Sequence, residues 1–299
     1  LLRAWAMTQT SPAAPTYICL DVDLQEGAIE TPPALPDIRR FAPAEPPAMT
    51  AHDIVKARTL LAAAQRPLLL VGRHVRSQEA WDARIAFAEA IGAAVLCDQK
   101  CGVGFPSSHP AFIAAPAQYP DARAAALIAQ ADLIVSLDWP DLKGLLALRP
   151  DKGAGVPTLI ASPDERLHNG WAFDHFPFAE ADLRAAVTPE RFVSALLESG
   201  LPSRAGSHWT IPPARLPDVP GTGPITVPAL AVAFDRARGD RAVCLTRLTF
   251  GLPDAMIRFE GPFDCIGYDG GGGIGSTPGI TVGAALALKG SGRLPLSIL

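Results

Sequence analysis

The glycine-rich run Gly270-Gly-Gly-Gly-Ile-Gly275 is the feature of this sequence best suited to chemistry. It satisfies the pattern G-x-G-x-x-G, in which glycines let the chain turn tightly at a helix N-terminus and approach a pyrophosphate. A dinucleotide site of this type also needs an acidic residue about 20 residues further on, to bind the ribose hydroxyls. Residues 276–299 contain no Asp or Glu, so the NAD interpretation fails its own requirement.

Close packing without a ligand is the other interpretation of the glycines. It would account for one or two of them, but four in a row carry a large cost in backbone conformational entropy. We therefore expect a ligand to approach the backbone at this point.

The elements that position this run are predicted by alternating helices and apolar stretches from Thr50 onward. A continuous apolar run is typical of a strand buried on both faces and occurs at residues 67–71; residues 93–97, 132–137 and 156–161 are also strand-like and mostly apolar. Helical spacing of apolar residues occurs at 52–64, 79–91, 122–130 and 189–197. Strands alternating with helices predict an α/β fold with a Rossmann-like central domain and a parallel sheet, of a six-stranded type.

Two Pro-rich and Gly-rich stretches, residues 29–49 and 199–224, read as linkers. They divide the chain into segments 1–28, 50–198 and 225–299. In the first segment we expect a helix over 1–9 and a strand-like run over 15–20. In the last we expect a helix at 227–238, strands at 241–246, 263–267 and 293–299, and a helix from the glycines to Leu288.

Composition restricts the class of protein. The 299 residues are 48% apolar and 19% charged, with a net charge of −4 and no basic stripe, which argues against nucleic-acid binding. No stretch has the layout of a signal peptide or the length of a membrane span. The five cysteines are sparse and odd in number, as expected in a reducing cytoplasm, and Cys97 and Cys101 lack a second pair for zinc.

The run from Gly270 to Leu288, followed by residues 293–299, resembles the diphosphate-side domain of thiamine-diphosphate-dependent enzymes. Residues 15–25 look like the close of the pyrimidine-side domain, and 66–73 and 131–139 look like parts of the central domain. The resemblance follows the family's order over nearly the whole chain and is strongest to the acetolactate synthase and benzoylformate decarboxylase branch. It implies partial α/β domains at 1–28 and 225–299, flanking a whole central domain at 50–198.

The resemblance implies a few cofactor-binding residues. Ile274 matches the hydrophobic residue that lies under the cofactor and holds it bent, so that the aminopyrimidine amine reaches thiazolium C2. Gly272 matches the residue whose carbonyl accepts a hydrogen bond from the aminopyrimidine. Gly273 and Gly275 would let the chain turn close to the cofactor, and Thr249 is at about the place where the family binds diphosphate oxygens.

The same resemblance implies thiamine diphosphate and Mg²⁺ as cofactors, and cleavage or formation of a carbon–carbon bond in a 2-oxo acid or aldehyde. The enzyme would be a lyase or transferase. The Glu that activates the cofactor is expected upstream of Leu1 and the metal motif after Leu299, so this chain alone is expected to be inactive. Sites in the family form between subunits, which implies a homodimer or homotetramer.

Alternative interpretations concern the central domain. The equivalent domain binds FAD in acetolactate synthases and ADP in some relatives, but the single glycine after residues 67–71 favours a structural role here. A non-catalytic nucleotide-binding or regulatory module is the alternative function, favoured by an acidic residue closing a second strand. A homologue that has lost the metal motif is a third possibility. We interpret His109 as an exposed loop residue and Asp138 as a strand cap.

Overall fold

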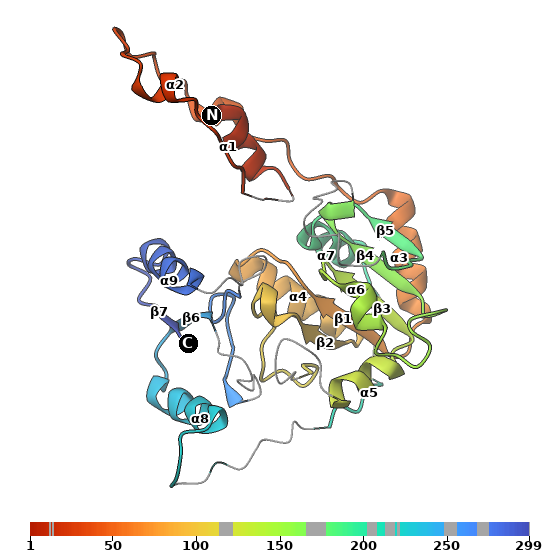
Figure 1. The fold of residues 1–299 in the computed structure, drawn as a ribbon. Coiled ribbons are helices and arrows are strands. Elements are labelled where there is room, and N and C mark those ends of the chain that lie inside the picture. Colours follow the sequence, from red (N-terminus) through yellow and green to blue (C-terminus); the bar gives the residue numbers. More distant parts are fainter. Residues whose placement is uncertain are drawn as a thin grey trace.

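The structure is a computed structural model that describes residues 1–11, 13, 15–113, 122–165, 178–201, 208–212, 219, 222–247, 256–267 and 275–298. These residues form a five-stranded parallel sheet of order β2-β1-β3-β4-β5 and a two-stranded parallel sheet, β6-β7. Figure 1 shows the larger sheet at the centre of a layered α/β arrangement.

The larger sheet is buried on both of its faces, as the apolar runs predict. Its strands are β1 (Pro67–Val71), β2 (Ala94–Cys97), β3 (Leu133–Leu137), β4 (Thr158–Ala161) and β5 (Leu183–Ala185). Because side chains alternate along a strand, Leu69 and Val71 of β1 belong to one hydrophobic cluster while Leu68 and Leu70 belong to another.

Helices cover each face of the larger sheet. The cluster with Leu69 includes side chains of α3 (Ala51–Ala63), α4 (Gln78–Ile91) and α7 (Pro189–Glu198). The cluster with Leu68 includes side chains of α5 (Ala122–Gln130) and α6 (Leu142–Leu146). The result is a three-layer, doubly wound α/β fold.

Local sequence signals set the ends of these helices. The hydroxyls of Thr50, Ser77 and Thr188 accept hydrogen bonds from first-turn amides of α3, α4 and α7, which is the preferred role of such residues at a helix start. Gly92 ends α4 in the left-handed conformation with φ 65°, where glycine avoids the strain of a Cβ atom.

A smaller unit contains α8 (Val227–Arg238), β6 (Val243–Arg247), α9 (Ser276–Ala287) and β7 (Leu294–Ser297). Its core cluster includes Leu245 and Phe259, together with Trp81 and Val103 from the side of the larger sheet. The two sheets are therefore joined by shared apolar packing.

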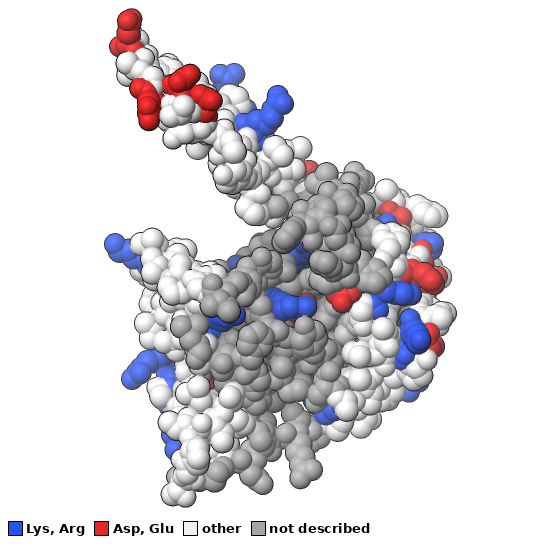
Figure 2. Space-filling model, in the orientation of Figure 1, with Lys and Arg blue, Asp and Glu red and all other residues white. Residues whose placement is uncertain are grey.

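The N-terminal residues form an arm that projects from the rest of the molecule (Figure 1). The arm carries α1 (Leu2–Gln9), α2 (Val22–Glu26) and the 3₁₀ turn η1 (Ile38–Phe41). Figure 2 shows acidic side chains gathered toward its tip, where Asp21, Asp23, Glu26 and Glu30 are exposed.

Several expected elements differ from the observed ones. Residues 15–20 form no strand, and Tyr17 is 92% exposed. The described part of the larger sheet has five strands where six were expected, and β5 and α6 were not anticipated. The expected strand at 263–267 is reduced to a single bridge between Cys265 and Leu245. Within the described residues, no helix has both the length and the apolar character needed to cross a membrane.

Candidate functional site

Helix α9 begins directly after the glycine-rich run in the sequence, and its first turn lies beside the end of β6. Gly275 precedes the helix in the left-handed conformation, with φ 89°, and no described side chain caps the first turn. A Cβ atom at Gly275 or Gly279 would meet no described heavy atom within 4 Å. The first-turn amides of a helix attract anions, so this end of α9 is suited to a phosphate group.

The end of β6 brings a cation to the same place. Arg247 is the last residue of β6, and its Nη1 lies 3.5 Å from Ser276 Oγ in the first turn of α9. The adjacent Thr246 is fully buried, and its hydroxyl shares a hydrogen bond of 2.8 Å with that of Thr281 in α9. This bond fixes α9 against β6, so Thr246 has a structural role.

Only one of the expected cofactor-binding residues can be placed. Gly275 lies at the start of α9, as the sequence predicts. Gly272, Gly273, Ile274 and Thr249 lie outside the described residues, so their roles stay predictions.

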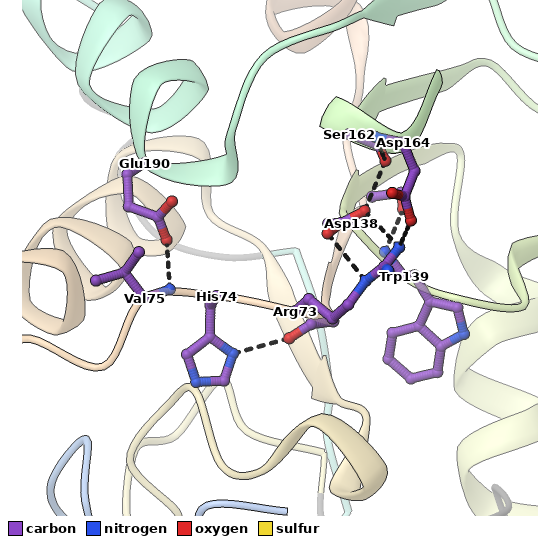
Figure 3. A network of polar contacts seen from close by, with 10 residues as sticks. Arg73, His74, Val75, Asp138, Trp139, Ser162, Asp164 and Glu190 are labelled. Carbon is purple, nitrogen blue, oxygen red and sulfur yellow. Dashed lines mark hydrogen bonds and ion pairs between the residues drawn. The ribbon is translucent and has the colours of Figure 1, made fainter. Parts of the chain in front are cut away.

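A polar network occupies the carboxyl edge of the larger sheet (Figure 3). Asp138 follows β3, and its Oδ1 accepts hydrogen bonds from Ser162 Oγ at 2.6 Å and from Arg73 Nη2 at 3.1 Å. Arg73, which follows β1, also forms an ion pair with Asp164. The network thus links the ends of β1, β3 and β4.

Burial dominates the electrostatics of this network. Asp138 is 6% exposed, and burial raises the pKa of its carboxyl group from 3.8 to about 6, although Arg73 and Ser162 oppose the rise. Its backbone has φ 53°, a conformation that Asp tolerates better than most residues. The expected strand-capping role of Asp138 is therefore accompanied by an ionic one, which the sequence did not indicate.

The turn after β1 tests the nucleotide interpretation of the larger sheet. A Cβ atom at Gly72 would lie 2.1 Å from the carbonyl oxygen of Asp138, so this glycine allows two strand ends to approach each other. Asp98 follows β2, where a ribose-binding acid is expected. Asp98 is however only 3% exposed, and its carboxylate accepts a hydrogen bond of 2.9 Å from the Lys100 amide. The described turn is therefore committed to internal contacts.

His74, in this turn, and His109, elsewhere in the chain, are also held by internal contacts. Burial is the main reason that the pKa of His74 falls to about 3, with Arg84 contributing, so this imidazole is neutral at ordinary pH. His109 was expected to be an exposed loop residue, but its side chain is 20% exposed and its ring packs edge-on against Phe105 at 5.0 Å. Among the described residues, no group of three or more His, Cys, Asp or Glu could hold a metal ion.

Sequence reasoning missed Arg73, Ser162 and Asp164. The available signal was their position, because each follows the end of a buried strand, and the carboxyl ends of parallel strands meet at one edge. The contacts among them depend on the strand order, which the local sequence does not specify.

The fold and these sites define a doubly wound α/β protein with a second, smaller α/β unit, in which a glycine-rich run precedes helix α9 in the sequence. Residues 54–137 match the family described as "Thiamine pyrophosphate enzyme, central domain". This part of the chain is therefore similar to the central domain of the thiamine pyrophosphate enzymes.

A curated relative and three solved structures are also similar to this chain. Sulfoacetaldehyde acetyltransferase of Rhodobacter capsulatus is 30% identical over 146 residues, which are 48% of this chain and 21% of that protein. Benzoylformate decarboxylase of Polynucleobacter necessarius is similar with a TM-score of 0.74 and 20% identity, over 99% of this chain and 54% of that one.

The other two structures give the same picture. A protein of Mycobacterium smegmatis, described as a thiamin diphosphate-dependent enzyme, has a TM-score of 0.72 and 21% identity, over 99% of this chain and 55% of that one. A 4-hydroxybenzoylformate decarboxylase of Rhodococcus jostii has a TM-score of 0.60 and 16% identity, over 88% and 49%. At these identities the structures establish the fold alone. The chain spans about half the length of each of these solved chains and a fifth of the curated relative.

Proposed function

We propose that this chain is part of an enzyme that uses thiamine diphosphate and Mg²⁺ to break or form a carbon–carbon bond next to a carbonyl group. Its substrate would be a 2-oxo acid or an aldehyde derived from one. The observation that carries this proposal is the match of residues 54–137 to the central domain of the thiamine pyrophosphate enzymes.

The smaller unit supports the proposal. A strand, β6, is followed in the sequence by a glycine-rich segment, then by α9 and by β7, which pairs with β6 in parallel. The first turn of α9 has no side-chain cap among the described residues, and together with the left-handed Gly275 and the nearby Arg247 it suits a doubly negative diphosphate group. We therefore regard the described residues as fitting the cofactor.

Residue roles follow from this proposal. The amides of Ser276 and Thr277, at the start of α9, would donate to diphosphate oxygens, and Arg247 would balance their charge. The predicted contacts of Gly272, Gly273 and Ile274 with the aminopyrimidine ring, and of Thr249 with the diphosphate, belong to the same proposal. Bound thiamine diphosphate would supply the carbon nucleophile and electron sink for the reaction.

The choice between lyase and transferase depends on the fate of the carbon fragment after cleavage. Decarboxylases and an acetyltransferase both occur among the relatives, and we propose a decarboxylase or an acetolactate synthase-like enzyme. We further propose a homodimer or homotetramer in the cytoplasm.

A calorimetric titration of the whole gene product tests the cofactor. We expect thiamine diphosphate with Mg²⁺ to bind with a micromolar or lower Kd, and thiamine without the diphosphate to bind at least about a hundredfold more weakly, a difference of about 2.8 kcal/mol. Equal binding of the two compounds, or of neither, would overturn the proposal.

The reaction is tested by incubating the loaded protein with a panel of 2-oxo acids and measuring CO2 release. Aldehyde as the product would assign a lyase, whereas a product carrying the fragment on a second acceptor would assign a transferase. No turnover of any 2-oxo acid by the loaded protein would contradict the proposed substrate class.

A further inference from the structure

The larger sheet's side and the smaller unit meet along two short backbone segments, which we call the seam. On one side are residues 101–103, which follow β2. On the other are residues 265–267, which end where the segment 268–274 begins. The Val103 amide donates to the Cys265 carbonyl oxygen at 3.1 Å. The two backbones therefore meet directly.

Two glycines make this approach possible. A Cβ atom on Gly102 would lie 2.7 Å from the Cys265 carbonyl oxygen, and a Cβ atom on Gly267 would lie 2.2 Å from the Gly102 amide nitrogen. Both residues also have positive φ, 91° and 69°, which strains any residue with a Cβ atom. The seam is thus built for one fixed geometry.

Arg76 bridges the seam with a single guanidinium group. It lies in the turn between β1 and α4, and its Nη2 donates to the Cys101 carbonyl oxygen at 2.9 Å and to the Ile266 carbonyl oxygen. One acceptor belongs to each side of the seam. Carbonyl groups in such partly buried places need donors, and a charged donor gives the stronger hydrogen bond.

The far side of residues 264–266 is held by β6. The Leu245 amide donates to the Asp264 carbonyl oxygen at 2.8 Å, and the Ile266 amide donates to the Leu245 carbonyl oxygen at 3.0 Å. Residue 266 is therefore clamped between β6 and Arg76, one residue before Gly267.

We propose that Arg76 is a positioning residue that holds the backbone at Ile266 against residues 101–103, and thereby fixes the smaller unit, with its proposed cofactor-binding helix start, relative to the larger sheet. This inference rests on the proposed thiamine diphosphate function. Arg76 acts through the Ile266 carbonyl group and does not touch the cofactor. It extends the role of the β1–α4 turn, because Arg73 in the same turn points toward Asp138 (Figure 3) and contacts the carboxyl edge of the larger sheet.

The test compares Arg76→Gln, Arg76→Lys and the control Arg241→Gln in the whole gene product. Arg241 is an exposed arginine of the smaller unit, whose guanidinium lies 3.5 Å from the Ala237 carbonyl oxygen and away from the seam. Two quantities are measured for each protein: the Kd for thiamine diphosphate with Mg²⁺, and the hydrogen-exchange rates of the amides of Val103, Ile266 and, in the buried strand β1, Leu69.

We expect Arg76→Gln to weaken thiamine diphosphate binding at least about tenfold and to accelerate exchange at Val103 and Ile266 by a similar factor, with Leu69 unchanged. Arg76→Lys keeps the charge but donates from a single point, so it should bind with intermediate affinity. Arg241→Gln should match the unaltered protein in every measurement.

Unchanged cofactor affinity in Arg76→Gln, or weaker affinity without faster exchange at the seam, would overturn the positioning role while leaving the proposed function intact. Failure of the unaltered protein to bind thiamine diphosphate would overturn the proposed function, and this inference with it. If Arg76→Gln also accelerates exchange at Leu69, its fold is damaged, and Arg76→Lys decides between the same outcomes.

Discussion

The larger sheet and the smaller unit differ in how much of their apolar surface is buried. The larger sheet is covered on both faces, and every residue of β1 to β4 is buried. In the smaller unit, α9 buries only Thr277, while Val282 is 61% and Leu286 is 71% exposed. Its core cluster also includes Trp81 and Val103 from the side of the larger sheet.

The larger sheet therefore accounts for most of the buried core, whereas the smaller unit carries the proposed cofactor site. The larger sheet has a fully buried core, and ion pairs of Arg73 with Asp138 and Asp164 link its strand ends at the carboxyl edge. The smaller unit carries the start of α9, for which no described side chain provides a cap, and it contacts the larger sheet's side at the seam. Changes in the first region should therefore act on global stability, and changes near the seam should act on the local unit.

Removing a core side chain from the larger sheet should have the largest effect. Leu69 of β1 is fully buried, so Leu69→Ala should lower the free energy of unfolding by about 2–5 kcal/mol, through lost burial and the cavity left behind. The matched control is Leu286→Ala on α9, which should change stability by less than about 0.5 kcal/mol. Urea denaturation measures both, and equal losses would contradict the contrast between the regions.

The Arg73–Asp138 network should give the larger sheet a distinctive pH dependence. The carboxyl group of Asp138 has a pKa of about 6 in the folded protein, against 3.8 normally, so between these values the folded state holds a proton that the unfolded state releases. Stability from this group is therefore present near pH 4 and is lost as the pH rises through 6, by up to roughly 3 kcal/mol.

Asp138→Asn removes this titration and keeps a residue that tolerates positive φ. Unfolding free energies at pH 4.5, 5.5 and 7 should show the unaltered protein losing stability relative to the variant as the pH rises. Parallel curves would mean that Asp138 does not titrate in this range, so that its carboxylate is held charged by Arg73 and Ser162.

Adding a methyl group in the seam should disturb the smaller unit selectively. Gly267→Ala places a Cβ atom 2.2 Å from the Gly102 amide nitrogen, and we expect a loss of about 2 kcal/mol that appears as local opening. Gly155→Ala is the control, because Gly155 also has positive φ, 74°, but nothing described within 4 Å of its Cβ position. Proteolysis within residues 225–298 should increase for Gly267→Ala alone; equal sensitivity of the two variants would argue against a tight seam.

The smallest effect on stability should come from a change in the segment of residues 208–212, which packs near the start of β1. The indole nitrogen of Trp209 donates to the Pro67 carbonyl oxygen at 2.9 Å, at the start of β1. Trp209→Phe keeps most of the apolar contact and loses this bond, so the free energy of unfolding should fall by about 1 kcal/mol. A loss of unfolding free energy as large as that of Leu69→Ala would show that residues 208–212 belong to the core.

Sequence reasoning found the elements whose signal is local. Residues 67–71 and 132–137 were predicted as strands because they are wholly or mostly apolar, and β1 and β3 confirm them. By contrast, β5 has three residues with Arg184 in the middle, too short to give a pattern. Residues 15–20 have strand-forming composition but no pairing strand among the described residues, which is why that prediction was wrong.

The site was predictable only in part. The glycines before α9 pointed to a helix start, and Gly275 occupies it. The contact of Gly102 with Gly267 and the bridge by Arg76 join residues far apart in the chain, and such pairings follow from topology that no local pattern encodes. The buried ion pairs of Arg73 depend in the same way on the strand order β1-β3-β4.

Hydrogen exchange of the whole gene product, with and without thiamine diphosphate and Mg²⁺, tests the central claim most directly. The account predicts that the cofactor protects the amides of Ser276 and Thr277 at the start of α9, while those of residues 72–76 after β1 keep their rates. Protection confined to residues 72–76, or no protection at either place, would contradict the account.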